Sequence, residues 1–302
     1  MRKVLIVVAV VVAVVAVVGV VALLARQDSA PERVGSEPAA GTAAETSTAD
    51  PPGTDAAAPA VSDAVRVYFV RDEKIGVGAR DASPTADTEA LALHAMRELV
   101  TGPTAEESEF GLGTTIPEGT HVNGVRIEGA VASVDLSEDF ASGGGSLSML
   151  LRVAQVVCTL TQFEGVDRVA FELDGEKAEA VGGEGIIVSP PVSRRDVEGQ
   201  LPAILVEDPV PGQTVRSPVA VSGSSNVFEA RHQLVLTDAD GAILIDEPVD
   251  ATSGTGERGL WATKVTLPPL KREGFGAVTV YAVSPKGGDR TDLVDIPVRL
   301  TR

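Results

Sequence analysis

The chain of 302 residues is long enough for about two domains, and it is acidic, since 43 Asp and Glu against 25 Lys and Arg give a formal net charge of −18. A nucleic-acid-binding surface needs clustered Lys and Arg. The composition therefore argues against nucleic acid as a partner, and against a folded part that lies on anionic lipid. The sole cysteine, Cys158, excludes an intrachain disulfide.

The N-terminus carries a long apolar segment, because the residues from Val4 to Ala25 are uncharged and are mostly Val, Ala, Leu or Ile. At ~1.5 Å per residue it spans about 33 Å, close to the ~30 Å hydrocarbon core of a bilayer. Arg2 and Lys3 favour a cytoplasmic N-terminus. We expect residues 1–25 to be an uncleaved single-pass anchor in the cell membrane, with everything after it extracytoplasmic. A cleaved signal peptide, with an apolar core of usually ~7–15 residues, is the alternative.

Residues 26–63 are rich in Ala, Pro, Ser, Thr, Gly and acids. A segment with so little apolar surface to bury cannot offset its chain entropy. We expect a disordered linker that holds the folded part away from the membrane.

The first predicted domain covers residues 64–188. Alternating apolar residues predict strands, and apolar residues at steps of three and four predict two helices. The order is β-β-α-β-β-α-β, which indicates an α+β domain with two helices packed on one face of a single sheet. The predicted elements are strands at 65–70, 75–80, 122–127, 131–136 and 168–173, and helices at about 87–100 and from Ser146.

The helix that follows Ser146 has an apolar face that includes Leu151, Ala154 and Cys158. Free cysteine is among the most buried residue types, so we expect Cys158 to be a structural thiol in the core. The polar residues of the same helix define a second face, which we expect to point outward as a docking surface. These residues are Arg152, Gln155, Thr159 and Gln162.

Several segments of this domain carry a family resemblance. They are VYFVRD (67–72), ALHAMRELVTGP (92–103), TTIPEGTHVNGVRIEG (114–129), VASVDLSEDF (131–140) and QVVCTLTQFEGVDRVAFELDG (155–175). Together they resemble the GerMN domain, the sporulation and spore-germination domain of extracytoplasmic bacterial proteins, whose fold is similar to ring-building-motif domains. The resemblance implies a role in assembly or envelope binding, without an established catalytic set.

Residues 189–202 contain Pro and polar residues, and we expect them to be a linker. From residue 203 to 302, seven short strands at regular spacing indicate an all-β immunoglobulin-like sandwich. The predicted strands are 204–207, 219–223, 233–237, 242–246, 261–267, 277–283 and 294–300. Residues 208–218, VSGSSNVFEA (221–230), LTDADGAIL (236–244) and VYAVSPKGG (280–288) resemble the immunoglobulin-like domain of bacterial spore germination proteins.

No group of residues forms a recognisable catalytic or metal motif. His94, His121 and His232 lie far apart in the sequence, without the short spacing of metal ligands. The glycine run before Ser146 lacks the lysine of a phosphate-binding loop, and no GxSxG motif is present. We therefore predict no catalytic residue, no cofactor and no metal, and expect the protein not to be an enzyme.

Two fragments leave alternatives open. Asp238-Ala-Asp-Gly241 fits either the start of a calcium loop or a hairpin turn, and its position between two apolar strands favours the turn. Trp261 fits either a platform for stacking sugars or the core of the sandwich, and the alternation around it favours the core.

Two functions therefore compete. The first is a non-catalytic, membrane-anchored envelope protein that binds other envelope proteins or copies of itself, in a context such as sporulation or germination. The alternative is a cell-wall module that binds peptidoglycan or another glycan. Glycan sites stack sugars on exposed aromatic side chains, and beyond Trp261, Tyr68, Tyr281 and seven Phe the chain has none to offer.

Overall fold

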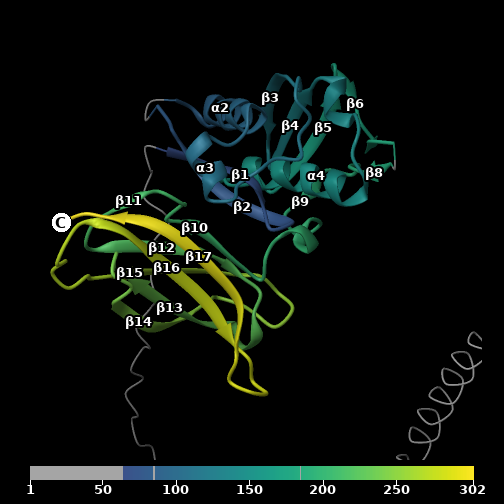
Figure 1. The fold of residues 1–302 in the computed structure, drawn as a ribbon. Helices are drawn as coiled ribbons and strands as arrows, with labels where there is room; N and C mark the ends of the chain where they lie inside the picture. Colours follow the sequence, from purple (N-terminus) through teal and green to yellow (C-terminus); the bar gives the residue numbers. More distant parts are fainter. Residues whose placement is uncertain (1–63, 84–85, 184) are drawn as a thin grey trace, which may run out of the picture. The chain divides into compact units, whose positions relative to one another are not determined.

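The computed structural model describes residues 64–83, 86–183 and 185–302, all of which belong to one compact unit, Asp55–Arg302 (Figure 1). The predicted anchor, Val4 to Ala25, and the predicted linker at 26–63 lie outside the described residues. Within the described ranges, no helix combines the length and apolarity that a bilayer span requires.

The first domain opens with a hairpin of two antiparallel strands, β1 (Ala64–Arg71) and β2 (Lys74–Asp81). Asp72 and Glu73 make the two-residue turn, and both have positive φ angles, 51° and 59°. Two residues in the left-handed region give the turn a twist that matches the twist of the strands.

Two helices follow, α2 (Thr88–Thr101) and the short α3 (Ala105–Glu109). The side chain of Asp87 caps α2 by accepting a hydrogen bond from the amide of Ala90, at 2.8 Å. Gly102, with φ 91°, ends the helix and donates its N–H back to Glu98 and Leu99. Thr104 and Glu107 form a capping box at the start of α3. The strand predicted at 75–80 and the helix predicted at about 87–100 are thus present as β2 and α2.

The central sheet of this domain has the order β3 (Val122–Glu128), β4 (Val131–Leu136), β5 (Arg168–Leu173) and β6 (Glu176–Lys177). The 3₁₀ turn η1 (Glu138–Ala141) and the long helix α4 (Ser146–Leu160) connect β4 to β5, which run parallel. A parallel pair needs such a crossover. The strands and helices predicted here are confirmed.

The prediction of a single sheet is wrong. β1 and β2 form a separate two-stranded sheet, while helix α2 contacts both β1 and β3, and α4 contacts both β1 and β5. The helices therefore lie between the hairpin and the central sheet, where each covers apolar residues on both sides (Figure 1).

Residues 180–202 complete the first domain rather than linking it to the next. The short hairpin β7 (Ala180–Val181) and β8 (Ile186–Ile187) lies against α4, and β9 (Val192–Ser193) pairs with β5. A 3₁₀ turn, η2 (Glu198–Gln200), follows. Val192, Val197 and Leu201 are buried in the hydrophobic core of the first domain. The segment predicted as a linker is thus folded into this domain.

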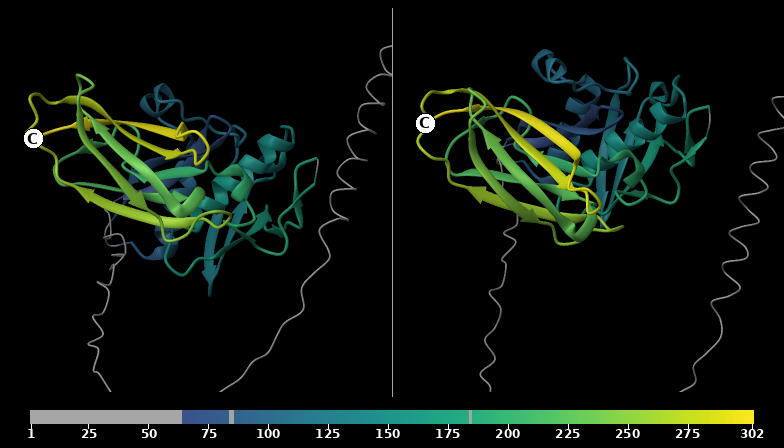
Figure 2. Two further views of the ribbon diagram at one scale, coloured as in Figure 1. Left: turned by 90° about the horizontal axis from the view of Figure 1, so that it is seen from below. Right: turned by 60° about the horizontal axis from the view of Figure 1, so that its bottom comes forward.

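The second domain is a sandwich of a three-stranded sheet, β10-β12-β15, and a five-stranded sheet, β11-β17-β16-β13-β14 (Figure 2). All seven predicted strands are present, and the short β11 is added. The core between the sheets includes Val221, Leu234, Trp261 and Val278. The elements are β10 (Ile204–Asp208), β11 (Thr214–Val215), β12 (Val219–Ser225), η3 (Phe228–Ala230), β13 (Arg231–Thr237), β14 (Ile243–Asp250), β15 (Gly259–Val265), β16 (Gly274–Val283) and β17 (Arg290–Leu300).

Candidate functional site

The polar face of α4, predicted to be a docking surface, is inside the protein. Arg152 is only 2% exposed, Gln155 and Thr159 are fully buried, and Gln162 is partly buried. The prediction that this face points outward is therefore wrong.

The reason lies in the free edge of β1. Only one edge of this strand pairs with β2, so Arg66 and Tyr68 direct their remaining backbone groups toward α4. Gln162 accepts from the amide of Arg66 at 2.8 Å and donates to its carbonyl at 2.7 Å. Thr159 accepts from the amide of Tyr68 at 3.2 Å, and Gln155 donates to its carbonyl at 3.3 Å. Two side chains of α4 and that of Gln162, just after the helix, thus take the place of a neighbouring strand and satisfy backbone groups that would be costly to bury without partners.

Arg152 has a similar internal role at the other end of this stripe. Its guanidinium donates to the carbonyl oxygens of Thr115 at 2.9 Å and Ser142 at 3.0 Å, and also to that of Phe140. Burial lowers the pKa of Arg152 from its ordinary value. The side chain ties two loops to the helix, and no part of this polar stripe is left as an open binding surface.

A cluster of charged side chains joins the two domains. Tyr68 from β1 donates its hydroxyl to Glu207 of β10 at 2.6 Å, and Arg194 donates to the same carboxylate oxygen at 3.0 Å. Arg194 also donates to the Tyr68 hydroxyl at 2.9 Å and to the carbonyl of Cys158 at 3.0 Å. A buried ion pair of this kind is tolerated where further hydrogen bonds satisfy both groups, as they do here.

The electrostatics of this cluster follow from burial and from Arg194. Burial strongly raises the pKa of Tyr68, so its hydroxyl keeps its proton and acts as a donor. Burial also opposes the charge of Glu207. The charge of Arg194 and the hydrogen bonds from Tyr68 and Arg194 outweigh it and hold the pKa of Glu207 below its usual range. Glu207 is therefore a charged acceptor fixed between two donors.

Apolar residues reinforce the same contact. Leu205 and Val210 of the second domain belong to the hydrophobic core of the first. At one flank Arg258 pairs with Glu198 at 2.9 Å, and at another Arg299 pairs with Glu106 at 2.6 Å. The two domains thus share part of one core.

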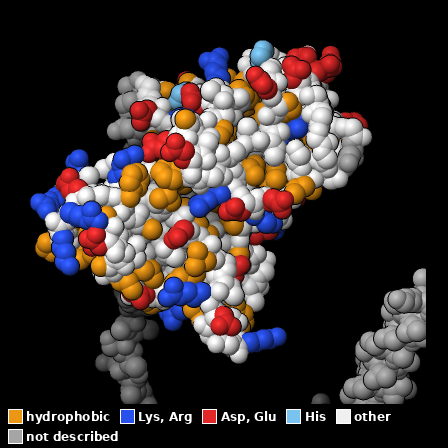
Figure 3. Space-filling model, viewed as in Figure 1, with side chains coloured by type: hydrophobic (Ala, Val, Ile, Leu, Met, Phe, Trp, Pro, Cys, Tyr) orange, Lys and Arg blue, Asp and Glu red, His pale blue; other side chains and the backbone are white. Residues whose placement is uncertain are grey.

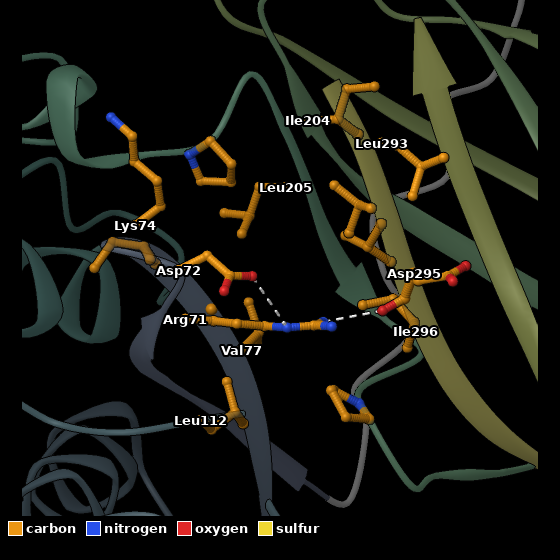
Figure 4. Close-up of a pocket in the computed structure, with 16 residues that line it drawn as sticks. Arg71, Asp72, Lys74, Val77, Leu112, Ile204, Leu205, Leu293, Asp295 and Ile296 are labelled. Carbon is orange, nitrogen blue, oxygen red and sulfur yellow. Dashed lines mark hydrogen bonds and ion pairs between the residues drawn. The ribbon is translucent and has the colours of Figure 1, made fainter. Parts of the chain in front are cut away.

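Beside this contact the hairpin and the sandwich leave a pocket of about 180 Å³ (Figure 4). Its walls are mostly aliphatic and come from both domains. Arg71 spans the pocket by donating to the carbonyl of Asp295 at 2.9 Å, and Lys74 donates to the carbonyl of Gly199 at 2.6 Å. Figure 3 shows hydrophobic side chains exposed among charged ones on the viewed face. The lining residues are Arg71, Asp72, Lys74, Ile75, Gly76, Val77, Leu112, Pro202, Ile204, Leu205, Val206, Pro211, Leu293, Val294, Asp295 and Ile296.

The other predicted residues fall where the sequence placed them. Cys158 is fully buried, and burial raises the pKa of its thiol to about 11. Trp261 is 4% exposed and lies in the core of the sandwich, 4.6 Å from the ring of His232. Asp238 accepts from the amides of Asp240 and Ala242, both at 2.9 Å, which makes the hairpin turn before β14. Both core predictions and the turn are confirmed.

The three histidines lie on separate elements: His94 on α2, His121 before β3 and His232 on β13. Across the described part of the chain, no three His, Cys, Asp or Glu side chains are grouped to hold a metal ion. The arrangement that the described residues offer is therefore a pair of coupled domains with a pocket beside their junction.

Comparisons with known proteins match both domains. The family described as sporulation and spore germination matches residues 66–179, and the immunoglobulin-like domain of bacterial spore germination matches residues 203–289. No curated protein matches the chain.

The solved structures that resemble this chain include the following three. The first GerMN domain of the sporulation protein GerM from Bacillus subtilis is 24% identical, with a TM-score of 0.38, over 45% of this chain and 100% of that one. The tandem GerMN domains of the same protein are 17% identical, with a TM-score of 0.38, over 68% of this chain and 61% of that one. A putative lipoprotein from Clostridium perfringens is 18% identical, with a TM-score of 0.34, over 46% of this chain and 90% of that one.

Proposed function

We propose that this chain, which carries a sporulation and spore germination (GerMN) domain followed by an immunoglobulin-like domain of bacterial spore germination, is a non-catalytic envelope protein that acts through contacts with other proteins. Both resemblances drawn from the sequence are confirmed. In this proposal residues Val4 to Ala25 anchor the chain in the cell membrane, and the folded domains are extracytoplasmic. Its partners are envelope proteins or further copies of the chain.

The coupling of the two domains carries this proposal. Leu205 and Val210 enter the core of the first domain, and Glu207 is held by Tyr68 and Arg194. Two domains that share a core keep a fixed geometry and present one composite surface. A fixed composite surface suits an adaptor, which must hold partners in a defined relation.

The glycan-binding alternative receives less support from the aromatic residues. Trp261, Tyr68 and Tyr281 are all buried, so none offers a face for stacking sugars. Within the described ranges the exposed aromatic side chains are Phe228 and Phe275, and Phe275 already lies near Phe110 and beneath Arg299. No aromatic platform therefore faces solvent beside the pocket.

Chemical crosslinking of the intact chain in its own envelope tests the proposal. We expect adducts with a defined envelope protein or with a second copy of the chain. Recovery of insoluble peptidoglycan without any protein adduct would overturn it. For the anchor, N-terminal sequencing of the membrane-extracted protein should find the residues ahead of Val4 still attached, whereas a mature start between Arg26 and Pro31 contradicts an uncleaved anchor.

A further inference from the structure

We infer that the sandwich encloses an internal water site, in which Ser225, His232 and Trp261 hold at least one ordered water molecule. The inference goes beyond the proposed function and does not depend on it. It is argued from the polar atoms that lack partners, from the strands that bring them together and from the hydrogen bonds that they can make.

The three side chains carry buried polar atoms without partners. Ser225 is fully buried, His232 is 1% exposed and Trp261 is 4% exposed. In the described residues, the hydroxyl of Ser225, both ring nitrogens of His232 and the indole nitrogen of Trp261 have no hydrogen-bond partner. Every buried side-chain nitrogen or oxygen without a partner in that part of the chain belongs to this set. Polar atoms are costly to bury unpaired, and their concentration at one place indicates a shared partner.

Three strands place these side chains together inside the sandwich (Figure 1). In the pairing of β12 with β15, Ser225 lies opposite Gly259, and Gly223 lies opposite Trp261. Residues two apart on a strand share a face, so Ser225 points to the same side as Trp261, which belongs to the core between the sheets. His232 comes from β13 in the other sheet, and its ring centre lies 4.6 Å from that of Trp261. The polar side chains therefore meet in the core between the two sheets.

Water matches the hydrogen-bonding groups of this set. The hydroxyl of Ser225 donates and accepts, whereas the indole of Trp261 only donates. Burial lowers the pKa of His232 to about 4, so at neutral pH its ring is uncharged and offers one donor and one acceptor. A water molecule both donates and accepts, and a buried one typically makes about three hydrogen bonds, which suits this mixture.

Neither a metal ion nor an organic ligand suits the same place. A metal ion needs acceptor atoms, and the indole N–H of Trp261 is only a donor. Asp250 is the acid whose charge acts on His232, and its two carboxylate oxygens already accept from Arg231 at 2.7 and 3.0 Å. The side chains of the site are at most 4% exposed, which leaves no entrance for a larger molecule.

Two loops close the sandwich over this site. Thr255 donates its amide to the carbonyl of Val227 at 2.9 Å, and the amide of Gly256 donates to the side chain of Asn226 at 2.9 Å. Asn226 follows Ser225 directly, so these hydrogen bonds lie next to the site. A water molecule behind them is closed off from solvent, and we expect it to exchange more slowly than water at the surface.

Nuclear magnetic resonance of the intact chain in detergent micelles tests this inference, because the single tryptophan gives a single indole N–H signal. We expect a nuclear Overhauser effect between that proton and water, with the sign of a long-lived bound water. Ser225→Val replaces the hydroxyl by methyl groups that fill the site, so the effect should be lost. Ser222→Val is the matched control, because Ser222 lies on the same strand with its side chain on the opposite face, and it should retain the effect.

An absent effect in the wild-type chain, or an effect that Ser225→Val leaves unchanged, would overturn the inference. A crystal structure of the unmodified chain gives a second test that needs no variant. We expect a water oxygen within about 3.2 Å of at least two of the four polar atoms. Direct hydrogen bonds among the three side chains, with no water between them, would overturn the inference.

Discussion

The hairpin β1–β2 meets the second domain in two regions that differ in character. At Tyr68 the contact is closed, since Arg194 and Glu207 satisfy each other and the tyrosine hydroxyl within a buried cluster. At the turn of the same hairpin the contact is looser, since Arg71 donates to the carbonyl of Asp295 across a pocket and otherwise lies 3.8 Å from the carboxylate of its neighbour Asp72. The difference indicates that the buried cluster at Tyr68 does more to hold the two domains together than the contact at the turn of the hairpin.

Breaking the closed region should have the largest effect. Arg194→Ala removes the main cation beside Glu207 and leaves a buried carboxylate without its ion pair. We expect the free energy of unfolding to fall by about 3–5 kcal/mol in urea titrations. Arg126→Ala removes a more exposed pair with Glu172 and should barely change the unfolding midpoint. Equal losses in the two variants would contradict the role assigned to the cluster.

The pH dependence of the sandwich should show the next largest effect. His232 is buried without a hydrogen-bond partner for either ring nitrogen in the described residues, and burial lowers its pKa to about 4. The unfolded chain, with a histidine pKa near 6.5, binds more protons between pH 6.5 and pH 4. The contribution of neutral His232 to the free energy of unfolding is therefore complete above pH 6.5. It falls by up to about 3 kcal/mol as the pH drops to 4.

Urea titrations between pH 7 and pH 5.5 measure this slope, above the range in which most carboxylates titrate. His232→Gln removes the titrating ring and should flatten the pH profile. A slope that persists in this variant would show that another group is responsible.

The helix side chains that cap β1 should have a moderate effect. Thr159→Val keeps the shape of the side chain but leaves the amide of Tyr68 without its acceptor. We expect a loss of about 1–3 kcal/mol, with faster hydrogen exchange at the Tyr68 amide. Thr159→Ser keeps the hydroxyl and should retain slow exchange at that amide. Fast exchange in both variants would mean that the hydroxyl is not the acceptor that matters.

The looser region, at the turn of the hairpin, should have the smallest effect on stability. Leu293→Asp changes a half-exposed side chain at the rim of the pocket, so the free energy of unfolding should stay within about 0.5 kcal/mol. Thermal melting measures this. A large loss of stability would mean that Leu293 holds the domains together, and the contrast between the two regions would disappear.

The sequence predicted those features that depend on local pattern. Alternation located all seven long strands of the sandwich and placed Trp261 inside it, and the helical period placed Cys158 in the core. These predictions succeed because neighbouring residues report whether a strand or helix has an apolar side.

The predictions that were wrong concern residues whose contacts lie in distant parts of the chain. The polar residues of α4 recur at helical spacing, which is equally consistent with a solvent-facing side and with a side that satisfies the backbone of another strand. Gln162 bonds to Arg66, 96 positions earlier. Arg194 lies in a polar segment that resembles a linker, yet its partner Tyr68 is 126 positions away. Periodicity carries no information about such partners. The one signal of a buried role was that the polar residues Gln155 and Thr159 stand among apolar residues along the second half of the helix.

The chain carries its own probes for the central claim that the two domains are coupled into one unit. The single tryptophan, Trp261, reports on the sandwich, and the single cysteine, Cys158, reports on the first domain. Urea unfolding of the intact chain should be followed by the fluorescence of Trp261 and by the accessibility of the Cys158 thiol. Coincident transitions, with Arg194→Ala shifting both together, are the result expected of a coupled pair. Two separate transitions, one for each probe, would contradict the account.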